Sequence, residues 1–318
     1  MSDFGDVMRS ILRGEKSDKD IQDFLVGLNE VGLTSEQVRI GVEIMRENMT
    51  PANIPNAIDI VGTGGTGLQT LSISTASALV CAGAGARVAK HGNRAASSLT
   101  GTADTLSELG VNLAITPEKA AECVDKAGVG FLFAPNHHPA MRFVGPARKA
   151  IGKRTLFNLL GPMSNPAGTK RMLVGVNNDD WRHLMAQAFA GLGVEHIWVV
   201  HGSDGLDEIT TTGPTYVSEV KDGTITEFTI TPQDFDIKPV TIEDLRGRDP
   251  AKNALAITGL LGGIESAYRD IVLLNSGAAL MLAGMAKNIQ RGIDIAYHSI
   301  ESGRARTALD KLIEVSNG

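Results

Sequence analysis

A short apolar segment, residues 58–61, runs into a glycine-dense turn and then into a stretch rich in serine and threonine. The turn contains Gly62, Gly64, Gly65 and Gly67. Because glycine adopts backbone conformations that other residues avoid, this order predicts a strand, a tight turn and a helix. The first amides of such a helix lack intrahelical acceptors and favour an anion. The stretch therefore predicts a phosphate-binding turn at the end of a strand.

From residue 58 onward, apolar segments typical of strands alternate with helical ones. This alternation predicts a mainly parallel sheet with helices on both faces, and a ligand at the carboxyl ends of its strands. Two further segments with alternating polarity flank a turn at Asp222 and predict a hairpin. The expected strands are residues 58–61, 87–89, 130–133, 172–176, 196–200, 215–220 and 224–230.

The first 50 residues have the pattern of helices alone. Ser17 and Thr34 each stand at a position suited to capping a helix, and Pro51 ends the block. We therefore expect an α/β protein with a small all-helical domain and a large mainly parallel α/β domain. The small domain is expected to comprise residues 1–55, completed by residues 137–165, and the large domain residues 56–136 and 166–318.

Composition narrows the class of protein. The chain of 318 residues has a net charge of −6, which makes a nucleic-acid partner unlikely because binding to nucleic acid favours a basic surface. Cys81 and Cys123 lie in apolar surroundings and predict buried thiols, not a disulfide. We expect a cytoplasmic protein, because neither a signal peptide nor an apolar run of membrane-spanning length is found.

The turn matches the dinucleotide-binding pattern G-x-G-x-x-G. That pattern also needs an acidic residue after the next strand, and Lys90, His91 and Arg94 occupy that place instead. NAD is therefore disfavoured, whereas NADP remains open because a cation there would meet its additional phosphate. No Gly-Lys-Ser/Thr follows, which excludes a P-loop. A turn without any ligand also remains open.

A second polar loop follows the next predicted strand. It starts at Lys90 and continues through small and hydroxyl-bearing residues to Thr102. A solvated turn is the alternative, but two such loops at consecutive strand ends favour a phosphate site.

Two further positions suggest chemistry. Asp207 and Glu208 follow a predicted strand and suit Mg²⁺, although a solvated acidic loop is the alternative. Arg148 is either a carboxylate-binding residue or a surface cation. His137 and His138 lack a third ligand at a suitable spacing, which makes zinc unlikely.

Together these residues resemble the anthranilate phosphoribosyltransferases over nearly the whole chain. The glycine turn alone is shared with pyrimidine nucleoside phosphorylases, whereas the combination is specific. The matching segments are residues 62–65, 73–75, 90–94, 137–141, 157–162, 165–166, 201–202 and 206–208.

The resemblance implies a fold like that of nucleoside phosphorylases and phosphoribosyltransferases, and a homodimer formed through the small helical domain. It implies transfer of phosphoribosyl from phosphoribosyl pyrophosphate (PRPP) to the amine of anthranilate in tryptophan biosynthesis, with Mg²⁺ as cofactor. No covalent catalytic residue is implied.

The resemblance also implies roles for individual residues. The metal positions are Ser74, Asp207 and Glu208. The anthranilate positions are Gly62, Asn93, His138, Arg148, Gly161 and Pro162. The PRPP positions are Gly62, Gly64, Gly65, Thr66, Thr70, Ser72, Ser74, Thr75, Lys90, His91, Gly92, Asn93, Arg94, Ser97, Ser98 and Thr102.

The chain departs from the family pattern at four positions. Thr66 replaces an aspartate, Ser72 an asparagine, Leu99 a lysine and Phe143 a histidine. The first three lie on the PRPP side, so we expect any altered behaviour in PRPP or Mg²⁺ use.

Three alternatives to this transferase remain. The first is a diverged paralogue with the same fold that binds another ligand, such as a nucleic acid, and has altered or lost PRPP chemistry. The second is a different phosphoribosyl or nucleoside transferase, and the third an NADP oxidoreductase.

Overall fold

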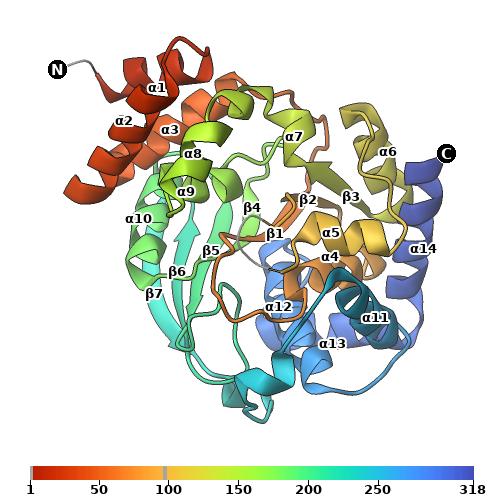
Figure 1. The fold of residues 1–318 in the computed structure, drawn as a ribbon. Coiled ribbons are helices and arrows are strands. Elements are labelled where there is room, and N and C mark those ends of the chain that lie inside the picture. Colours follow the sequence, from red (N-terminus) through yellow and green to blue (C-terminus); the bar gives the residue numbers. More distant parts are fainter. Residues whose placement is uncertain (1–2, 96–98) are drawn as a thin grey trace.

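The computed structural model of the chain describes residues 3–95 and 99–318. Its centre is a seven-stranded sheet in the order β3-β2-β1-β4-β5-β6-β7 (Figure 1). The first five strands in this order run parallel, and β6 and β7 form the expected antiparallel hairpin. The strands are β1 (Ile58–Gly62), β2 (Val88–Gly92), β3 (Val129–Phe133), β4 (Arg171–Gly175), β5 (His196–Gly202), β6 (Thr215–Lys221) and β7 (Thr224–Ile230). The prediction of a mainly parallel sheet is confirmed.

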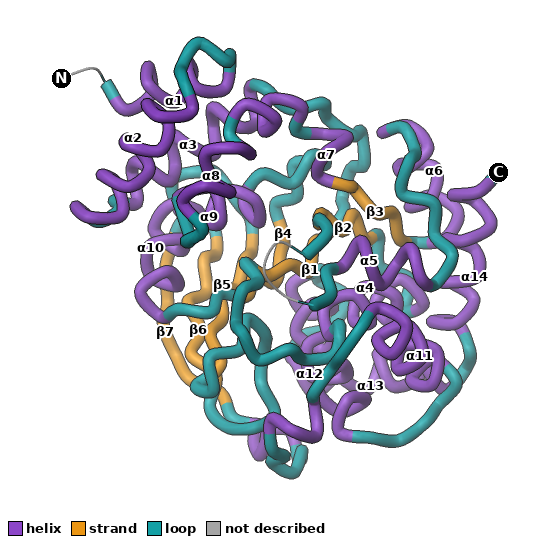
Figure 2. Tube along the Cα trace, in the orientation of Figure 1, coloured by secondary structure: helices purple, strands orange, loops and turns teal. Residues whose placement is uncertain are grey.

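Helices lie on both sides of this sheet (Figure 2). The α-helices are α1 (Phe4–Leu12), α2 (Asp18–Val31), α3 (Ser35–Glu47), α4 (Ile73–Gly83), α5 (Thr102–Glu108), α6 (Pro117–Ala127), α7 (Ala134–His137), α8 (Gly145–Ile151), α9 (Leu156–Met163), α10 (Asp179–Ala190), α11 (Pro250–Leu261), α12 (Ala267–Leu282), α13 (Ile289–Glu301) and α14 (Arg304–Asn317). The 3₁₀ helices are η1 (Pro139–Phe143), η2 (Pro232–Phe235) and η3 (Ile242–Leu245).

The central strands bury both of their faces. In β4, Leu173 belongs to one hydrophobic cluster, and its neighbours Met172 and Val174 belong to another. This change of side at each residue is the period of a strand. The first cluster joins the sheet to α4, α12 and α14, and the second joins it to α10 and to the N-terminal helices. The sheet is therefore covered on both sides, as parallel sheets are.

The N-terminal helices form where their caps predict them. Ser17 and Thr34 each make a capping box, with side chains that accept from the amides of Asp20 and Gln37. Their apolar residues pack with those of α8 and α9, including Leu156. Segments far apart in the sequence thus share one helical layer next to α10 (Figure 1).

Strand β2 differs from the prediction, which ended it at residue 89. It continues to Gly92 because Lys90 and His91 stay in parallel register with Phe131 and Leu132 of β3. Both side chains are consequently buried in the strand.

The loop after β1 also bears on the dinucleotide alternative. Residues 63–72 separate this strand from α4, so the G-x-G-x-x-G stretch does not open the helix directly. A dinucleotide fingerprint requires that direct junction, and the NADP alternative loses its structural basis.

Two predictions about composition are tested by the fold. Cys81 and Cys123 are buried free thiols, as expected. Within the described residues, no helix has the length and hydrophobicity to cross a bilayer.

Candidate active site

Polar segments meet beyond the carboxyl ends of the parallel strands. They are the glycine loop after β1 (residues 63–72), Lys90 at the end of β2, and the Asp207–Glu208 pair after β5. Because the strands are parallel, their carboxyl ends lie at the same edge of the sheet, as ligand sites of such folds do. Segments separated by more than 100 residues are thereby in direct contact.

Asp207 lies directly against the glycine loop. Its Oδ2 accepts a hydrogen bond of 2.7 Å from the amide of Gly64. A Cβ at Gly62 would lie 2.2 Å from Asp207 Oδ2, and a Cβ at Gly175 would lie 1.7 Å from the carbonyl oxygen of Asp207. Glycine at the ends of β1 and β4 therefore leaves the space that Asp207 occupies.

Glu208 and Lys90 converge on the start of α4. Glu208 Oε1 accepts from the amide of Ser74 (3.2 Å), and Lys90 Nζ donates to Ser74 Oγ (3.1 Å). Burial, with the nearby charge of Asp207, raises the pKa of Glu208, and burial also raises the pKa of Asp207. A cation bound between the two carboxylates would offset this cost.

Asp59, which was not predicted as a site residue, interacts with Lys90 through its charge. It is completely buried in β1 and accepts from Asn165 Nδ2 at 2.7 Å. Burial raises the pKa of Asp59 to about 6, and the charge of Lys90 opposes this shift. Burial lowers the pKa of Lys90, although the charges of three nearby carboxylates, Asp59, Glu208 and Asp207, act to raise it. A charged residue inside an apolar strand was the available sequence signal for Asp59.

The loop after β2 leads to α5, which begins at the predicted residue Thr102. Asn93 is exposed, and its Oδ1 accepts from the amide of Arg94 (2.8 Å). The guanidinium of Arg94 pairs with Asp104 at 2.8 Å. A Cβ at Gly101 would lie 2.4 Å from the amide nitrogen of Ala95, so only glycine fits where these two residues approach each other.

Ser97 and Ser98 of the predicted set lie outside the described residues. The other PRPP positions occupy four segments. These are the end of β1 with its loop (Gly62, Gly64, Gly65, Thr66, Thr70), the start of α4 (Ser72, Ser74, Thr75), the end of β2 (Lys90, His91, Gly92, Asn93, Arg94) and the start of α5 (Thr102).

Arg148 lies on α8, half-buried and above the ring of Phe157 at 5.8 Å. Its Nη2 donates at 3.5 Å to Asn158 Oδ1, and among the described residues no carboxylate pairs with it. Burial lowers the pKa of the Arg148 guanidinium. A partly desolvated guanidinium without a carboxylate partner is suited to bind the carboxylate of a ligand.

His91 and His138 lie against each other, with ring centroids 5.1 Å apart. His91 Nδ1 lies 3.2 Å from the carbonyl oxygen of Gly161, which sits one residue before Pro162 in α9. Mainly because of burial, the pKa of His91 falls to about 3 and that of His138 to about 4. Both rings are therefore neutral near pH 7. Within the described residues, His91 Nε2 and both His138 nitrogens make no hydrogen bond of good geometry.

Three of the departures from the family pattern lie in described surroundings. Thr66 Oγ1 accepts from the amide of Leu68 at 3.2 Å, and the Leu99 side chain is exposed. The Phe143 ring packs against Gly14, where a Cβ would lie 2.7 Å from it.

Ser72, the fourth departure, is held by residues that were not predicted. Its amide donates to Asn253 Oδ1 (2.9 Å), its hydroxyl lies 2.9 Å from Thr105 Oγ1, and Tyr268 donates to its carbonyl oxygen. No local motif marks Asn253, because it contacts a residue 181 positions away.

The donor set fits Mg²⁺ in part. No cluster of three or more His, Cys, Asp or Glu side chains suited to a metal occurs in the described part of the chain. Mg²⁺ usually binds through one or two carboxylates, water and substrate phosphates. Asp207 and Glu208, each with one backbone donor and further free lone pairs, satisfy that requirement.

Comparison with known proteins first gives the class. The sequence model of the glycosyl transferase family, a/b domain, matches residues 54–306. The anthranilate phosphoribosyltransferase of Sinorhizobium medicae is 52% identical over 308 residues, which cover 96% of this chain and 91% of that one. The enzyme of Parvibaculum lavamentivorans is 51% identical over 309 residues, covering 97% and 91%.

Solved structures similar to this chain belong to the same family of enzymes. The anthranilate phosphoribosyltransferase of Thermus thermophilus matches with a TM-score of 0.93 and 39% identity, over 99% of this chain and 95% of that one. The Saccharomyces cerevisiae enzyme in complex with PRPP and Mg matches with a TM-score of 0.89 and 26% identity, over 99% and 93%. The chain belongs to the anthranilate phosphoribosyltransferase family.

Proposed function

We propose that this protein transfers the phosphoribosyl group of PRPP to the amine of anthranilate, giving N-(5-phosphoribosyl)anthranilate and pyrophosphate in tryptophan biosynthesis. Family membership supports this reaction. The observation that carries the proposal is the contact between the Asp207–Glu208 pair, the glycine loop and Lys90 at one edge of the sheet. The carboxylates suit a metal ion, and the loop amides and Lys90 suit the phosphate groups of PRPP. All of them lie at one edge of the sheet.

PRPP is proposed to lie along the glycine loop and the start of α4. Backbone amides and the helix N-terminus favour its phosphates. Lys90 brings a cation to the pyrophosphate, where negative charge grows as the bond to ribose breaks. Mg²⁺, held by Asp207, Glu208 and Ser74, supplies charge stabilisation of the pyrophosphate when bound. The remaining PRPP positions are those that the resemblance implies.

Anthranilate is proposed to lie beside α8 and α9. Arg148 binds its carboxylate, and Asn93, His138, Gly62, Gly161 and Pro162 line its site. Orienting the amine toward the ribose turns a collision of two substrates into a positioned attack. The aromatic amine is a weak nucleophile, so departure of pyrophosphate leads and no covalent enzyme intermediate is required.

The test is the loss of anthranilate fluorescence when the purified protein is mixed with PRPP and Mg²⁺. Titrating PRPP to high concentration gives the KM for PRPP of a chain that carries Thr66, Ser72 and Leu99 in place of the residues usual in the family. A saturable, Mg²⁺-dependent loss supports the proposal. No turnover from folded protein at any PRPP concentration contradicts it and favours the diverged paralogue.

The protein is further proposed to act in the cytoplasm as a homodimer formed through its small helical domain, residues 1–55 with residues 137–165. Val31 on α2 is 89% exposed, so a charged substitution there alters the surface of the small domain without disturbing its core. Sedimentation equilibrium of the wild type and of Val31→Asp tests this proposal. A monomeric wild type contradicts it.

A further inference from the structure

Two carbonyl groups of the glycine loop are bound by side chains from other segments. Arg154, between α8 and α9, donates through Nη2 to the Gly65 carbonyl oxygen at 2.5 Å. Asn177, between β4 and α10, donates through Nδ2 to the Gly64 carbonyl oxygen. The two side chains are also joined, because Arg154 Nη1 donates to Asn177 Oδ1 at 2.7 Å. They form a connected unit, here called the Arg154–Asn177 pair.

The Arg154–Asn177 pair fits closely against the loop. A Cβ at Gly65 would lie 3.4 Å from Asn177 Nδ2 and 3.6 Å from Arg154 Nε. Gly64 and Gly65 have φ angles of +67° and +71°, in the left-handed region that glycine adopts readily. Without side chains of their own to pack, these residues depend on contacts from elsewhere for a defined orientation.

Arg154 is itself held from two sides. Its guanidinium lies 5.6 Å from the centroid of the Trp181 ring, and its carbonyl oxygen accepts from Asn29 Nδ2 of α2 at 2.8 Å. The cation–π contact with Trp181 favours this position of the guanidinium, and the Asn29 contact connects the segment to the N-terminal helices.

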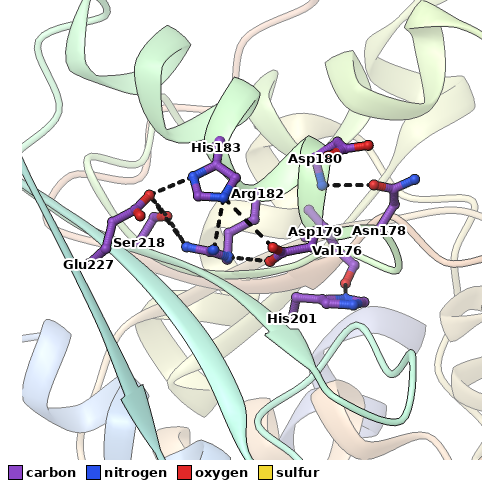
Figure 3. A network of polar contacts seen from close by, with 9 residues as sticks. All are labelled: Val176, Asn178, Asp179, Asp180, Arg182, His183, His201, Ser218 and Glu227. Atoms are coloured by element: carbon purple, nitrogen blue, oxygen red, sulfur yellow. Dashed lines mark hydrogen bonds and ion pairs between the residues drawn. The ribbon is translucent and has the colours of Figure 1, made fainter.

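The two residues that flank Asn177 in the sequence, Val176 and Asn178, are held by polar contacts (Figure 3). The carbonyl oxygen of Val176 accepts from His201 Nδ1 (2.8 Å), and Asn178 caps α10 by accepting from the Asp180 amide (2.8 Å). Buried Arg182 then joins this helix to Ser218 of β6 (2.6 Å). Asn177 therefore extends from a fixed position.

Because the peptides are planar and trans, binding a carbonyl of the loop also fixes the direction of the amide that follows it. The carbonyl of each peptide points opposite to the N–H of the next residue. When Asn177 binds the Gly64 carbonyl, the Gly65 amide points away from Asn177. When Arg154 binds the Gly65 carbonyl, the Thr66 amide points away in the same manner. Among the hydrogen bonds of the described residues, none has either amide as its donor.

We propose that Arg154, acting with Asn177, is a positioning residue that orients the amides of Gly65 and Thr66 toward the pyrophosphate group of PRPP. The inference rests on the proposed function and deepens it. Both amides stay free for an anion, while the neighbouring Gly64 amide binds Asp207. One loop thereby presents donors beside the carboxylates assigned to the metal.

The first experiment measures amide hydrogen exchange of the ligand-free protein and needs no activity. It compares Arg154→Gln with Lys153→Gln, which removes the same charge from an adjacent exposed residue. The amides of Thr63 and Gly64 donate to Gly175 and Asp207 and report on the loop. We expect about tenfold faster exchange of these amides in Arg154→Gln, and wild-type exchange in Lys153→Gln. Unchanged exchange in both variants overturns the inference.

The second experiment measures pyrophosphate binding by calorimetry with Mg²⁺ and the KM of each substrate. Arg154→Gln is expected to weaken pyrophosphate and to raise the KM of PRPP about tenfold, with the KM of anthranilate changed less than twofold. Arg154→Lys is not expected to restore binding, because an ammonium lacks the planar fork that bonds Gly65 and Asn177 together. Rescue by lysine would point to charge alone and overturn the positioning role.

A double-mutant cycle with Asn177→Ala separates positioning from general destabilisation. We expect the two losses in pyrophosphate affinity to be less than additive, because either change breaks the same unit. Additive losses contradict the inference. A wild type that binds pyrophosphate without transferring phosphoribosyl refutes the proposed function alone, and the exchange and calorimetric results then still decide the role of Arg154.

Discussion

The carboxylate of Asp207 fills the space in which a side chain at Gly62 would stand. The distance from an added Cβ to Asp207 Oδ2 is 2.2 Å, shorter than any stable contact between such atoms. From this position Asp207 binds the amide of Gly64, two residues further along the loop. A glycine at position 62 is therefore required by the place of Asp207, whereas the positive φ angles of the turn belong to Gly64, Gly65 and Gly67.

Gly62→Ala is expected to displace Asp207 and to lower kcat/KM for PRPP at least tenfold. Moving the carboxylate breaks its bond to Gly64 and alters the proposed metal site, and the crowding is expected to cost about 1–3 kcal/mol of stability. Turnover across a Mg²⁺ titration and urea unfolding measure both effects. Gly27→Ala is the control, since a Cβ there meets nothing within 4 Å. Wild-type kinetics in Gly62→Ala would show that Asp207 is not needed in this position.

Asp207→Asn combined with Glu208→Gln is expected to abolish Mg²⁺-dependent turnover without lowering the stability of the ligand-free protein. Burial raises the pKa of both carboxyls, so their charges are costly until a cation binds. Thermal unfolding with and without Mg²⁺ and PRPP measures the stability of the ligand-free protein and the stability gained on ligand binding. The wild type gains stability from the ligands, whereas the variant does not. Glu30→Gln, on the exposed surface of α2, is the control. A retained Mg²⁺ response would falsify the metal assignment.

Local signals in the sequence predicted much of the fold, and the roles of the site residues stay predictions. The capping residues Ser17 and Thr34 start helices, and the parallel-sheet rule grouped the glycine loop with Lys90, which lies at the same edge of the sheet. Such features depend on residues close in sequence or on a general property of parallel strands.

Contacts between distant segments were not predictable in this way. Arg154 binds a carbonyl 89 positions away, and Asn253 an amide 181 positions away. Neither has a distinctive neighbourhood in the sequence, and the partner in each case is backbone, which every residue possesses. The end of β2 was missed for a related reason. Lys90 and His91 look like loop residues until the buried partners of Lys90 are known.

Arg148→Ala is expected to raise the KM of anthranilate at least tenfold and to change the KM of PRPP less than threefold. The partly buried guanidinium has no carboxylate partner within the described chain, so its charge is available to the substrate. Steady-state kinetics with each substrate varied in turn measure the difference. Lys149→Ala removes a neighbouring exposed cation and serves as control. Equal increases for both substrates would exclude a specific role in binding the carboxylate.

The neutral buried rings of His91 and His138 are expected to contribute less stability as pH drops from 6.5 toward 4. The buried carboxyls of Asp59 and Glu208, whose pKa values are raised, act in the opposite direction over this range. The pKa values of the two histidines, about 3 and about 4 in the folded protein, lie below the ordinary value of 6.5. In this range each of these two histidines binds more protons in the unfolded chain than in the folded one, so its own contribution favours unfolding as pH falls. The stability that the neutral rings contribute is complete above pH 6.5 and is lost toward the folded pKa values. At pH 5 each ring is expected to contribute about 2 kcal/mol less to the free energy of unfolding than at pH 7.

Urea unfolding at pH 7 and pH 5 measures this dependence. His138→Gln is expected to lower the difference between the two pH values by about 2 kcal/mol, since glutamine does not titrate. His298→Gln, at an exposed position on α13, is the matched control and is expected to leave the difference unchanged. If His138→Gln shows the same pH dependence as the wild type, protonation of His138 is not coupled to unfolding.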